Sequence, residues 1–280
     1  MGTPIGEWKI ILPTLSPKKL WNAGKIALSY FLSRLTGRLF HFGMPVSIGI
    51  EPTTGCNLRC PQCPSGLRIF GRPTGMLDPQ NFRKLVDEVH DELIYLILYF
   101  QGEPYLNVNF LEMVKYAAQK QIFTSTSTNA HFLTPETAQK TVESGLHKVI
   151  ISIDGTTQET YQKYRVGGNL QKVIDGTKHL VEAKRNANSQ TPYILWQFIV
   201  FKHNEHQISD VIKLGKELGV DEVAIKTAQI YDYITGNEMI PENEEFSRYE
   251  LAEDGTYRLK HQLLNHCWKL WQGAEITLLF

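Results

Sequence analysis

The sequence predicts an α/β fold: a core of six parallel strands and their helices, with an N-terminal helical extension and a short C-terminal tail. Between residues 46 and 226, strand-like apolar runs alternate with helical patterns, which is typical of a parallel sheet covered by helices. The apolar runs are nearly continuous, as expected of strands buried on both faces. Six such units suit an incomplete barrel or a doubly wound sheet. We expect the extension over residues 1–44, the core over 45–228 and the tail over 229–280.

The N-terminal extension is expected to be mainly one long helix. Ser16 supplies a side-chain cap, and Pro17 occupies the first helical position, where its missing N–H is not needed. The helical pattern continues to about Arg38, and residues 43–45 then break the chain.

The same region is strongly basic. Between Trp8 and Ile50 there is no Asp or Glu, whereas six basic residues occur: Lys9, Lys18, Lys19, Lys25, Arg34 and Arg38. A basic amphipathic helix can lie on an anionic membrane surface, so peripheral membrane contact through residues 16–39 is one interpretation. At a uniform helical twist, however, the basic residues scatter around the axis. We therefore favour a helix packed on the outside of the core.

The core elements follow in order. The predicted strands are residues 46–51, 93–100, 122–129, 147–155, 193–201 and 221–226. The helical patterns between them cover residues 78–93, 110–120, 134–145, a segment through Tyr161, 170–184 and 207–218. Asp78 and Thr134 are expected caps, each followed by Pro, and Gly145 can close the helix that Thr134 opens. After residue 226 the pattern weakens, and residues 241–255 are acidic and loop-like.

Bulk composition excludes several classes of protein. The chain has 280 residues and no formal net charge, so we expect no nucleic-acid partner. Four cysteines in this length do not make a secreted disulfide framework. The sequence shows no secretory signal and no apolar stretch long enough to cross a bilayer, and we expect a cytoplasmic protein.

Three of the four cysteines lie in the nine residues CNLRCPQCP, which follow the first predicted strand. A disulfide leaves one thiol unexplained. A redox pair of Cys60 and Cys63 would open a helix in a thioredoxin-like fold, but the six-unit pattern around these residues is too long for that fold. A zinc site needs a fourth ligand, for which Cys267 is remote. An iron–sulfur cluster with three thiolate ligands uses all three cysteines and leaves one iron open to a small molecule.

Further motifs connect the cysteines to a known family. CNLRCPQC resembles the Cys-x3-Cys-x2-Cys signature of the radical S-adenosylmethionine (radical SAM) enzymes. QGEP (residues 101–104) resembles their Gly-Gly-Glu-Pro motif, STN (127–129) and SIDG (152–155) end the third and fourth strands, and YRVGG (164–168) follows. Each motif alone is weak, but their order on successive strands carries the resemblance. It covers roughly residues 46–226 and implies a partial (β/α)6 TIM-like barrel.

The resemblance implies one [4Fe–4S] cluster held by Cys56, Cys60 and Cys63. The open iron would chelate the amino and carboxylate groups of SAM. Reductive cleavage of SAM would then give methionine and a 5′-deoxyadenosyl radical, which abstracts hydrogen from a substrate. The substrate, a peptide or a small molecule, is not identified by these motifs. The electron would come from a donor such as a flavodoxin or ferredoxin.

The resemblance also assigns residues to SAM. Gly102 and Glu103 would meet its amino group, chiefly through backbone atoms, and Gly102 leaves room for a close approach. Ser152 would face the ribose or the carboxylate. Arg165 would pair with the carboxylate, since a guanidinium binds it with two parallel hydrogen bonds. Asp154 could stabilise a turn with Gly155 or reach the substrate, and we favour the turn.

Two positions depart from the family pattern. Gln101 replaces the first glycine of the Gly-Gly-Glu-Pro motif, which matters little if the contacts there are main-chain contacts. Gln62 stands where many members have an aromatic residue near the adenine, so the adenine contacts are open.

The tail resembles the start of a further family segment. CWKLW (residues 267–271) is similar to the opening of the SPASM extension, which carries auxiliary clusters. No cysteine follows Cys267, so either the extension is truncated or Cys267 has lost its role. We favour truncation and expect no auxiliary cluster in this chain. The alternatives to an active enzyme are a catalytically impaired cluster-binding fragment and a zinc-binding structural protein.

Overall fold

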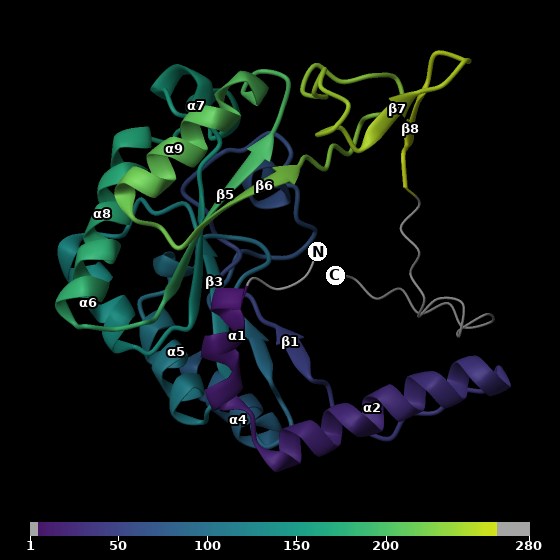
Figure 1. The fold of residues 1–280 in the computed structure, drawn as a ribbon, viewed down its shortest axis with the longest axis vertical. Helices are drawn as coiled ribbons and strands as arrows, with labels where there is room; N and C mark the ends of the chain where they lie inside the picture. The colour runs from purple at the N-terminus through teal and green to yellow at the C-terminus, as the bar shows by residue number, and fades with distance from the viewer. Residues whose placement is uncertain (1–4, 262–280) are drawn as a thin grey trace.

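The core of the protein is one parallel sheet of six strands. The structure is a computed structural model, and it describes residues 5–261. The strands pair in the order β1 to β6, every neighbouring pair is parallel, and Figure 1 shows the sheet curving as it proceeds. Their bounds are β1 Ser47–Gly49, β2 Tyr95–Ile97, β3 Phe123–Thr128, β4 Lys148–Ser152, β5 Tyr193–Val200 and β6 Glu222–Thr227.

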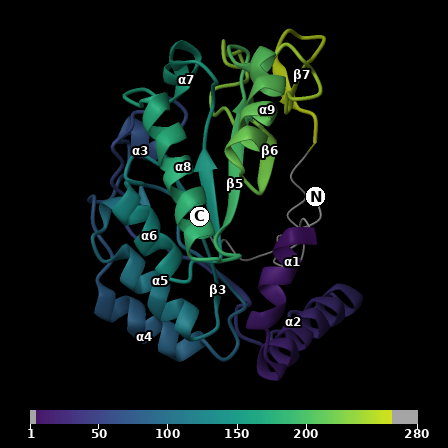
Figure 2. The same ribbon diagram turned by 60° about the vertical axis from the view of Figure 1, so that its left-hand side comes forward.

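This strand order decides between the two predicted architectures. A doubly wound sheet reverses its strand order near the middle, whereas here spatial order equals chain order throughout. The crossover helices cover one face of the sheet, as Figures 1 and 2 show. They are α4 Pro79–Val89, α5 Phe110–Gln119, α6 Pro135–Glu143, α7 Gln158–Tyr164, α8 Leu170–Asn186 and α9 Ile208–Leu218. The fold is the expected partial barrel.

Local sequence signals begin and end these helices as predicted. The Asp78 carboxylate accepts from the amides of Gln80 and Asn81 at 2.9 and 3.0 Å. The Thr134 hydroxyl accepts from an amide in the first turn of α6, and Gly145 follows that helix with φ +73°. The first amides of a helix have no partner within the helix, and these side chains accept their hydrogen bonds. The caps therefore fix where α4 and α6 begin.

The inner face of the sheet is closed at its N-terminal end by a helix that the sequence analysis missed. This helix, α1 (Ile5–Ile11), brings the buried Glu7 carboxylate to 2.8 Å from Nζ of Lys148 on β4. Ile10 packs against Ile150 and Leu195 on the same inner face. Because α1 covers one end of the sheet, the opposite end is the one left for a ligand.

Two predictions about element length were wrong. The apolar run at residues 93–100 was predicted as one strand, but β2 spans only Tyr95–Ile97. Leu93 and Leu98, beyond its ends, are fully buried, so the apolar run reports burial rather than strand length. The segment at residues 241–255 was predicted to be a loop, yet β7 (Tyr249–Leu251) pairs antiparallel with β8 (Tyr257–Leu259).

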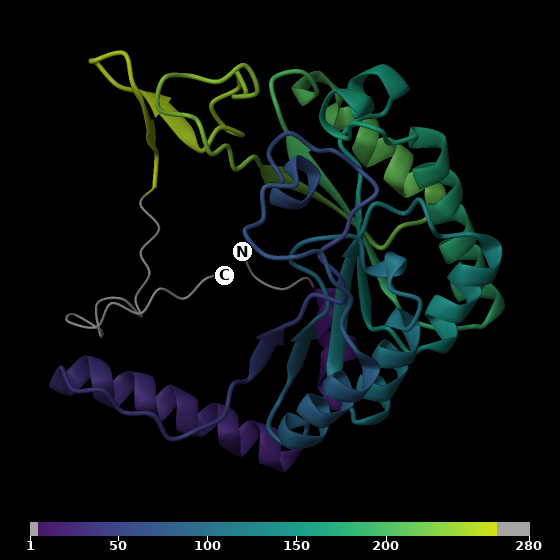
Figure 3. The same cartoon turned by 180° about the vertical axis from the view of Figure 1, so that it is seen from behind.

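The predicted N-terminal helix is α2 (Pro17–Thr36), and the Ser16 hydroxyl caps it. It follows α1 and a short 3-10 turn, Leu12–Thr14. Figure 3 shows α2 reaching away from the sheet, with residues 37–46 returning along it to β1. In the part of the chain that the structure describes, no helix is long and apolar enough to cross a membrane.

Candidate active site

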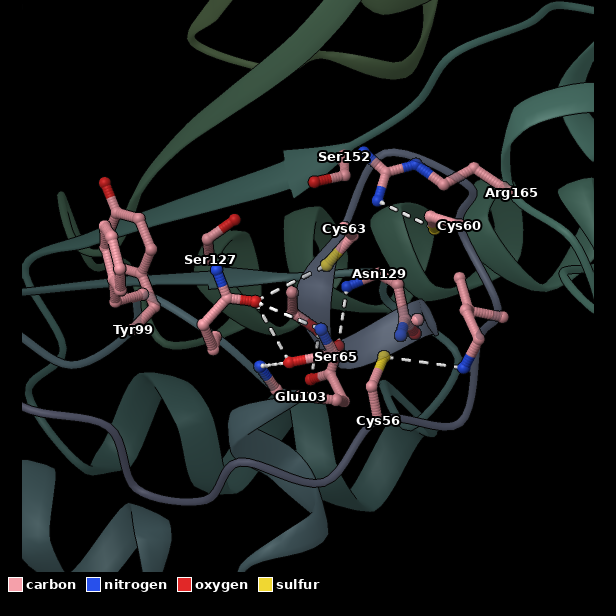
Figure 4. A pocket seen from close by; sticks show the side chains of 16 residues that line it. Cys56, Cys60, Cys63, Ser65, Tyr99, Glu103, Ser127, Asn129, Ser152 and Arg165 are labelled. Atoms are coloured by element: carbon pink, nitrogen blue, oxygen red, sulfur yellow. Dashed lines mark hydrogen bonds between the residues drawn. The ribbon is translucent and has the colours of Figure 1, made fainter. Parts of the chain in front are cut away.

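A pocket of about 140 Å³ lies at the C-terminal ends of the strands. The seven residues assigned above to metal and cofactor binding all line it: Cys56, Cys60, Cys63, Gly102, Glu103, Ser152 and Arg165. Figure 4 shows six of them converging on one space. The three cysteines come from the loop after β1, Glu103 from the loop after β2, Ser152 from the end of β4 and Arg165 from the end of α7. The parallel sheet explains this convergence, because the carboxyl ends of all its strands meet at one edge.

The three cysteines lie on a tight loop between β1 and the short helix α3 (Pro64–Leu67). Cys63 is the residue before α3, and its amide donates to the carbonyl of Cys60 at 3.2 Å. A Cβ at Gly66 would lie 2.5 Å from both the amide nitrogen and the carbonyl oxygen of Cys60, so this packing requires glycine. The backbone of the loop is thereby fixed with three free thiols around one space.

Burial controls the protonation of these thiols. It raises the pKa of Cys56 to about 11 and also raises the pKa of Cys60, where the nearby Arg165 charge opposes it. In the protein without a bound metal the two thiols are therefore protonated near neutral pH. A metal that binds thiolates would displace their protons.

The chemistry of the donors suits an iron–sulfur cluster, because each of three thiolates can bind a separate iron. Among residues 5–261, no group of three or more His, Cys, Asp or Glu side chains is placed to hold one metal ion. Cys267, the fourth ligand of the zinc alternative, lies outside the described residues.

Gly102 joins the loop after β2 to the cysteine loop. It has φ +80°, and an added Cβ would lie 2.2 Å from the carbonyl oxygen of Thr53. Its amide donates to the Ser65 hydroxyl at 2.9 Å, and the next amide, of Glu103, donates to the carbonyl of Gly55 at 2.8 Å. Gly102 therefore packs closely against Thr53 and Gly55, which directly precede the cysteines in the chain.

The Glu103 carboxylate is buried and fastens the loop after β2 to the end of β3. It accepts from the Thr128 hydroxyl at 2.7 Å and from the Asn129 amide at 2.8 Å. Burial raises the pKa of Glu103 to about 7, against the effect of these hydrogen bonds. The Glu103 side chain is therefore engaged within the protein, and a contact of this residue with SAM stays a prediction.

Arg165 is held by a buried ion pair that the sequence analysis did not foresee. Its Nε lies 2.5 Å from Oδ2 of Asp154, whose other oxygen accepts from the Ile199 amide at 2.8 Å. The expectation that Asp154 serves a turn was wrong, because its side chain is fully buried and points to Arg165. The Nη1 of Arg165 lies 3.9 Å from Sγ of Cys60, so the guanidinium places a positive charge beside the thiols.

Gln101 and Gln62, the two departures from the family pattern, both make side-chain contacts. The Gln101 side-chain oxygen lies 3.1 Å from the Ser65 hydroxyl and 3.5 Å from Sγ of Cys63. This replacement for glycine therefore contacts a cysteine, and the expectation that it matters little for main-chain contacts with SAM stays a prediction. Gln62 donates to Asp232 and accepts from the Tyr231 amide, which ties the cysteine loop to the segment after β6.

Sequence reasoning missed further polar residues at this edge. Ser65, Ser127 and Asn129 also line the pocket. Ser127 lies on the inner face of β3, and the Asn129 side chain donates to Asn57 at 2.8 Å inside the cysteine loop. The STN motif marked the end of β3, but its spacing did not show that Asn129 would reach across to another loop.

Comparisons with known proteins agree with this geometry. The profile of the Radical SAM superfamily matches residues 50–215, more than half of the chain. The PqqA peptide cyclase of Bradyrhizobium diazoefficiens is 25% identical over 227 residues, which are 79% of this chain and 57% of that protein. The AdoMet-dependent heme synthase of Methanosarcina barkeri is 30% identical over 176 residues, 62% of this chain and 48% of that protein. The chain thus spans about half the length of these relatives.

Solved structures share the fold. Streptococcus suis SuiB bound to S-adenosylmethionine superposes with a TM-score of 0.58 at 14% identity, over 74% of this chain and 46% of SuiB. SuiB bound to its precursor peptide SuiA also gives a TM-score of 0.58, at 15% identity, over 76% of this chain and 45% of SuiB. At this identity the likeness concerns the partial barrel alone.

Proposed function

Because the chain belongs to the radical SAM superfamily, we propose that it is an enzyme that cleaves S-adenosylmethionine at a [4Fe–4S] cluster held by Cys56, Cys60 and Cys63. The observation that carries this proposal is the pocket shared by the three free thiols and the four residues assigned to SAM. Residues 45–228 would form the catalytic core. When bound, the cluster supplies the electron that splits SAM into methionine and a 5′-deoxyadenosyl radical, which takes hydrogen from a substrate.

The protein's own part in this reaction is to position charge and exclude water. Arg165 would bind the carboxylate of SAM, because Asp154 holds its Nε side and leaves the guanidinium facing the pocket. The backbone at Gly102 and Glu103 would meet the amino group, and Ser152 would meet the ribose or carboxylate. Each group is fixed by buried hydrogen bonds or by the sheet, so little reorganisation is needed on binding.

We propose a peptide as the substrate class. The support is the printed function of the PqqA peptide cyclase and the peptide bound by SuiB. The heme synthase shows that a relative of similar identity acts on a different kind of molecule. A cytoplasmic location and a flavodoxin or ferredoxin as electron donor complete the proposal.

The test is anaerobic reconstitution with iron and sulfide, followed by reduction, addition of SAM and assay of 5′-deoxyadenosine. The proposal expects product from the wild type and none from Cys60→Ala. Cys267→Ala is a control, because Cys267 has no part in the proposed site. A reduced cluster without product would indicate an impaired fragment. Zinc in place of iron would contradict the proposal.

A further inference from the structure

The long helix α2 buries its polar side. Within this helix the buried residues are Lys19, Asn22, Ser29 and Ser33. The Asn22 side chain exchanges two hydrogen bonds with the backbone of Met44, at 2.8 and 2.9 Å. The hydroxyls of Ser29 and Ser33 each accept from a backbone amide of the returning segment, at 2.9 Å. Polar side chains thus join α2 to residues 40–44.

The first turn of α2 is anchored to the core. Nζ of the buried Lys19 donates to the carbonyls of Thr14 and Gln121, at 3.1 and 2.5 Å. Lys18 pairs with Asp91 at 2.7 Å. Figures 1 and 3 show the rest of the helix extending beyond the sheet. The helix is therefore held in place while its other side faces outward.

That outward side is apolar. Five large side chains lie within an arc of about 100° around the helix axis, at 3.6 residues per turn. We call them the α2 apolar face: Leu20, Trp21, Leu28, Phe31 and Leu35, with exposed fractions of 55, 72, 50, 61 and 71%. A contiguous patch of this kind on a soluble domain marks an interaction site.

Charge identifies the kind of partner. On the same helical projection, Lys25 borders the α2 apolar face on one side and Arg34 borders it on the other. Among the residues that the structure describes, neither pairs with an acidic residue, and the sequence has no Asp or Glu between Trp8 and Ile50. The basic residues of α2 scatter around the axis, as expected. The exposed face is formed by apolar residues, and Lys25 and Arg34 lie at its two edges.

We propose that the α2 apolar face binds the surface of an anionic lipid membrane, with α2 lying parallel to it. The apolar side chains would enter the region between headgroups and acyl chains, and the flanking cations would contact lipid phosphates. A second copy of this chain fits less well, because pairing two such faces brings their cations together without an acidic residue between them. The core would lie on the water side, attached through the polar side of the helix.

The test is co-sedimentation of the full chain with vesicles of neutral phosphatidylcholine or of phosphatidylcholine with one quarter anionic phosphatidylglycerol. We expect binding to the anionic vesicles that weakens with salt. Phe31→Ser should lower the partition coefficient about tenfold, since burial of a large apolar side chain drives insertion. Arg34→Gln should lower it about fivefold.

Control variants change exposed residues elsewhere on the molecule. Val108→Ser, at a position 89% exposed, and Lys213→Gln, on α9, should leave binding unchanged. Circular dichroism checks that each variant folds. No binding to anionic vesicles, equal binding to neutral ones, or unchanged binding of Phe31→Ser would overturn the proposal. So would a dimer that Phe31→Ser disperses in the absence of vesicle binding. None of these measurements depends on SAM cleavage.

Discussion

At the scale of single residues, the site depends on Gly102 for a steric reason. Two glycines have nearly the same backbone angle, Gly102 with φ +80° and Gly167 with φ +82°. An added Cβ at Gly102 would overlap the Thr53 carbonyl, whereas at Gly167 nothing lies within 4 Å. The two positions therefore separate the cost of a positive φ from the cost of a clash.

Gly102→Ala is expected to be the more damaging substitution. Gly167→Ala should lower the free energy of unfolding by about 1 kcal/mol, from backbone strain alone. Gly102→Ala should cost at least about 2 kcal/mol more, because the Thr53 segment must move. It should also lower the iron bound after reconstitution. Urea unfolding and iron analysis measure both effects; equal losses for the two variants would contradict the account.

Asp154 gives a second prediction at this scale. Asp154→Asn leaves the buried Arg165 charge without its partner, which should lower the free energy of unfolding by about 3 kcal/mol. Asp175→Asn is the matched control, because its pair with Lys178 is exposed and 4.0 Å long. We expect no measurable change for the control. A wild-type urea midpoint for Asp154→Asn would show that the ion pair does not stabilise the fold.

The sequence indicated which residues would gather at one place better than it indicated their partners. The cysteine spacing and the further motifs pointed to seven residues that all line the pocket. They did not indicate that Asp154 holds Arg165 or that Gln101 reaches Cys63. Such contacts depend on how one loop lies against another, and chain spacing carries no information about that.

At the scale of elements, the junction of β3 and β4 contains a pH-sensitive contact. Nδ1 of His147, at the start of β4, accepts the Thr124 amide at 3.1 Å, so the ring is neutral. Burial lowers the pKa of His147 to about 4, from an ordinary value of 6.5. Between these values the unfolded chain binds a proton that the folded protein does not.

The contribution of His147 to the free energy of unfolding should therefore be fully present above pH 6.5, and it should be lost as the pH falls towards 4. The loss approaches about 1.4 kcal/mol per pH unit within that window. Glu103, whose pKa is raised, contributes a slope of opposite sign, but it is present in both wild type and variant. The difference between wild type and His147→Gln isolates the histidine. His206→Gln, at an exposed position, is the control; identical pH profiles for wild type and His147→Gln would refute the assignment.

The elements that the sequence predicted are those whose signals lie within or next to the element in the chain. Each crossover helix has an apolar periodicity, and caps such as Asp78 lie next to it in the chain. The missed helix α1 is fixed instead by an ion pair to Lys148, 141 residues away. The missed hairpin is held by Tyr249, whose hydroxyl bonds to the backbone of Ile230. Distant contacts of this kind leave no pattern in the sequence.

At the scale of the whole molecule, the two ends of the sheet have different roles. The N-terminal end is closed by α1, and the C-terminal end carries the pocket with its three thiols. The sequential strand order brings every motif to that second end. The central claim is therefore that one four-iron cluster with an open iron lies there.

Electron paramagnetic resonance of the reduced, reconstituted protein tests this claim most directly. The account predicts four irons per chain and a signal of a reduced [4Fe–4S] cluster that changes shape when SAM is added, because SAM binds the open iron. Both properties should be lost in Cys60→Ala. A cluster signal that SAM leaves unchanged, or a protein that takes up zinc and no iron, would contradict the account.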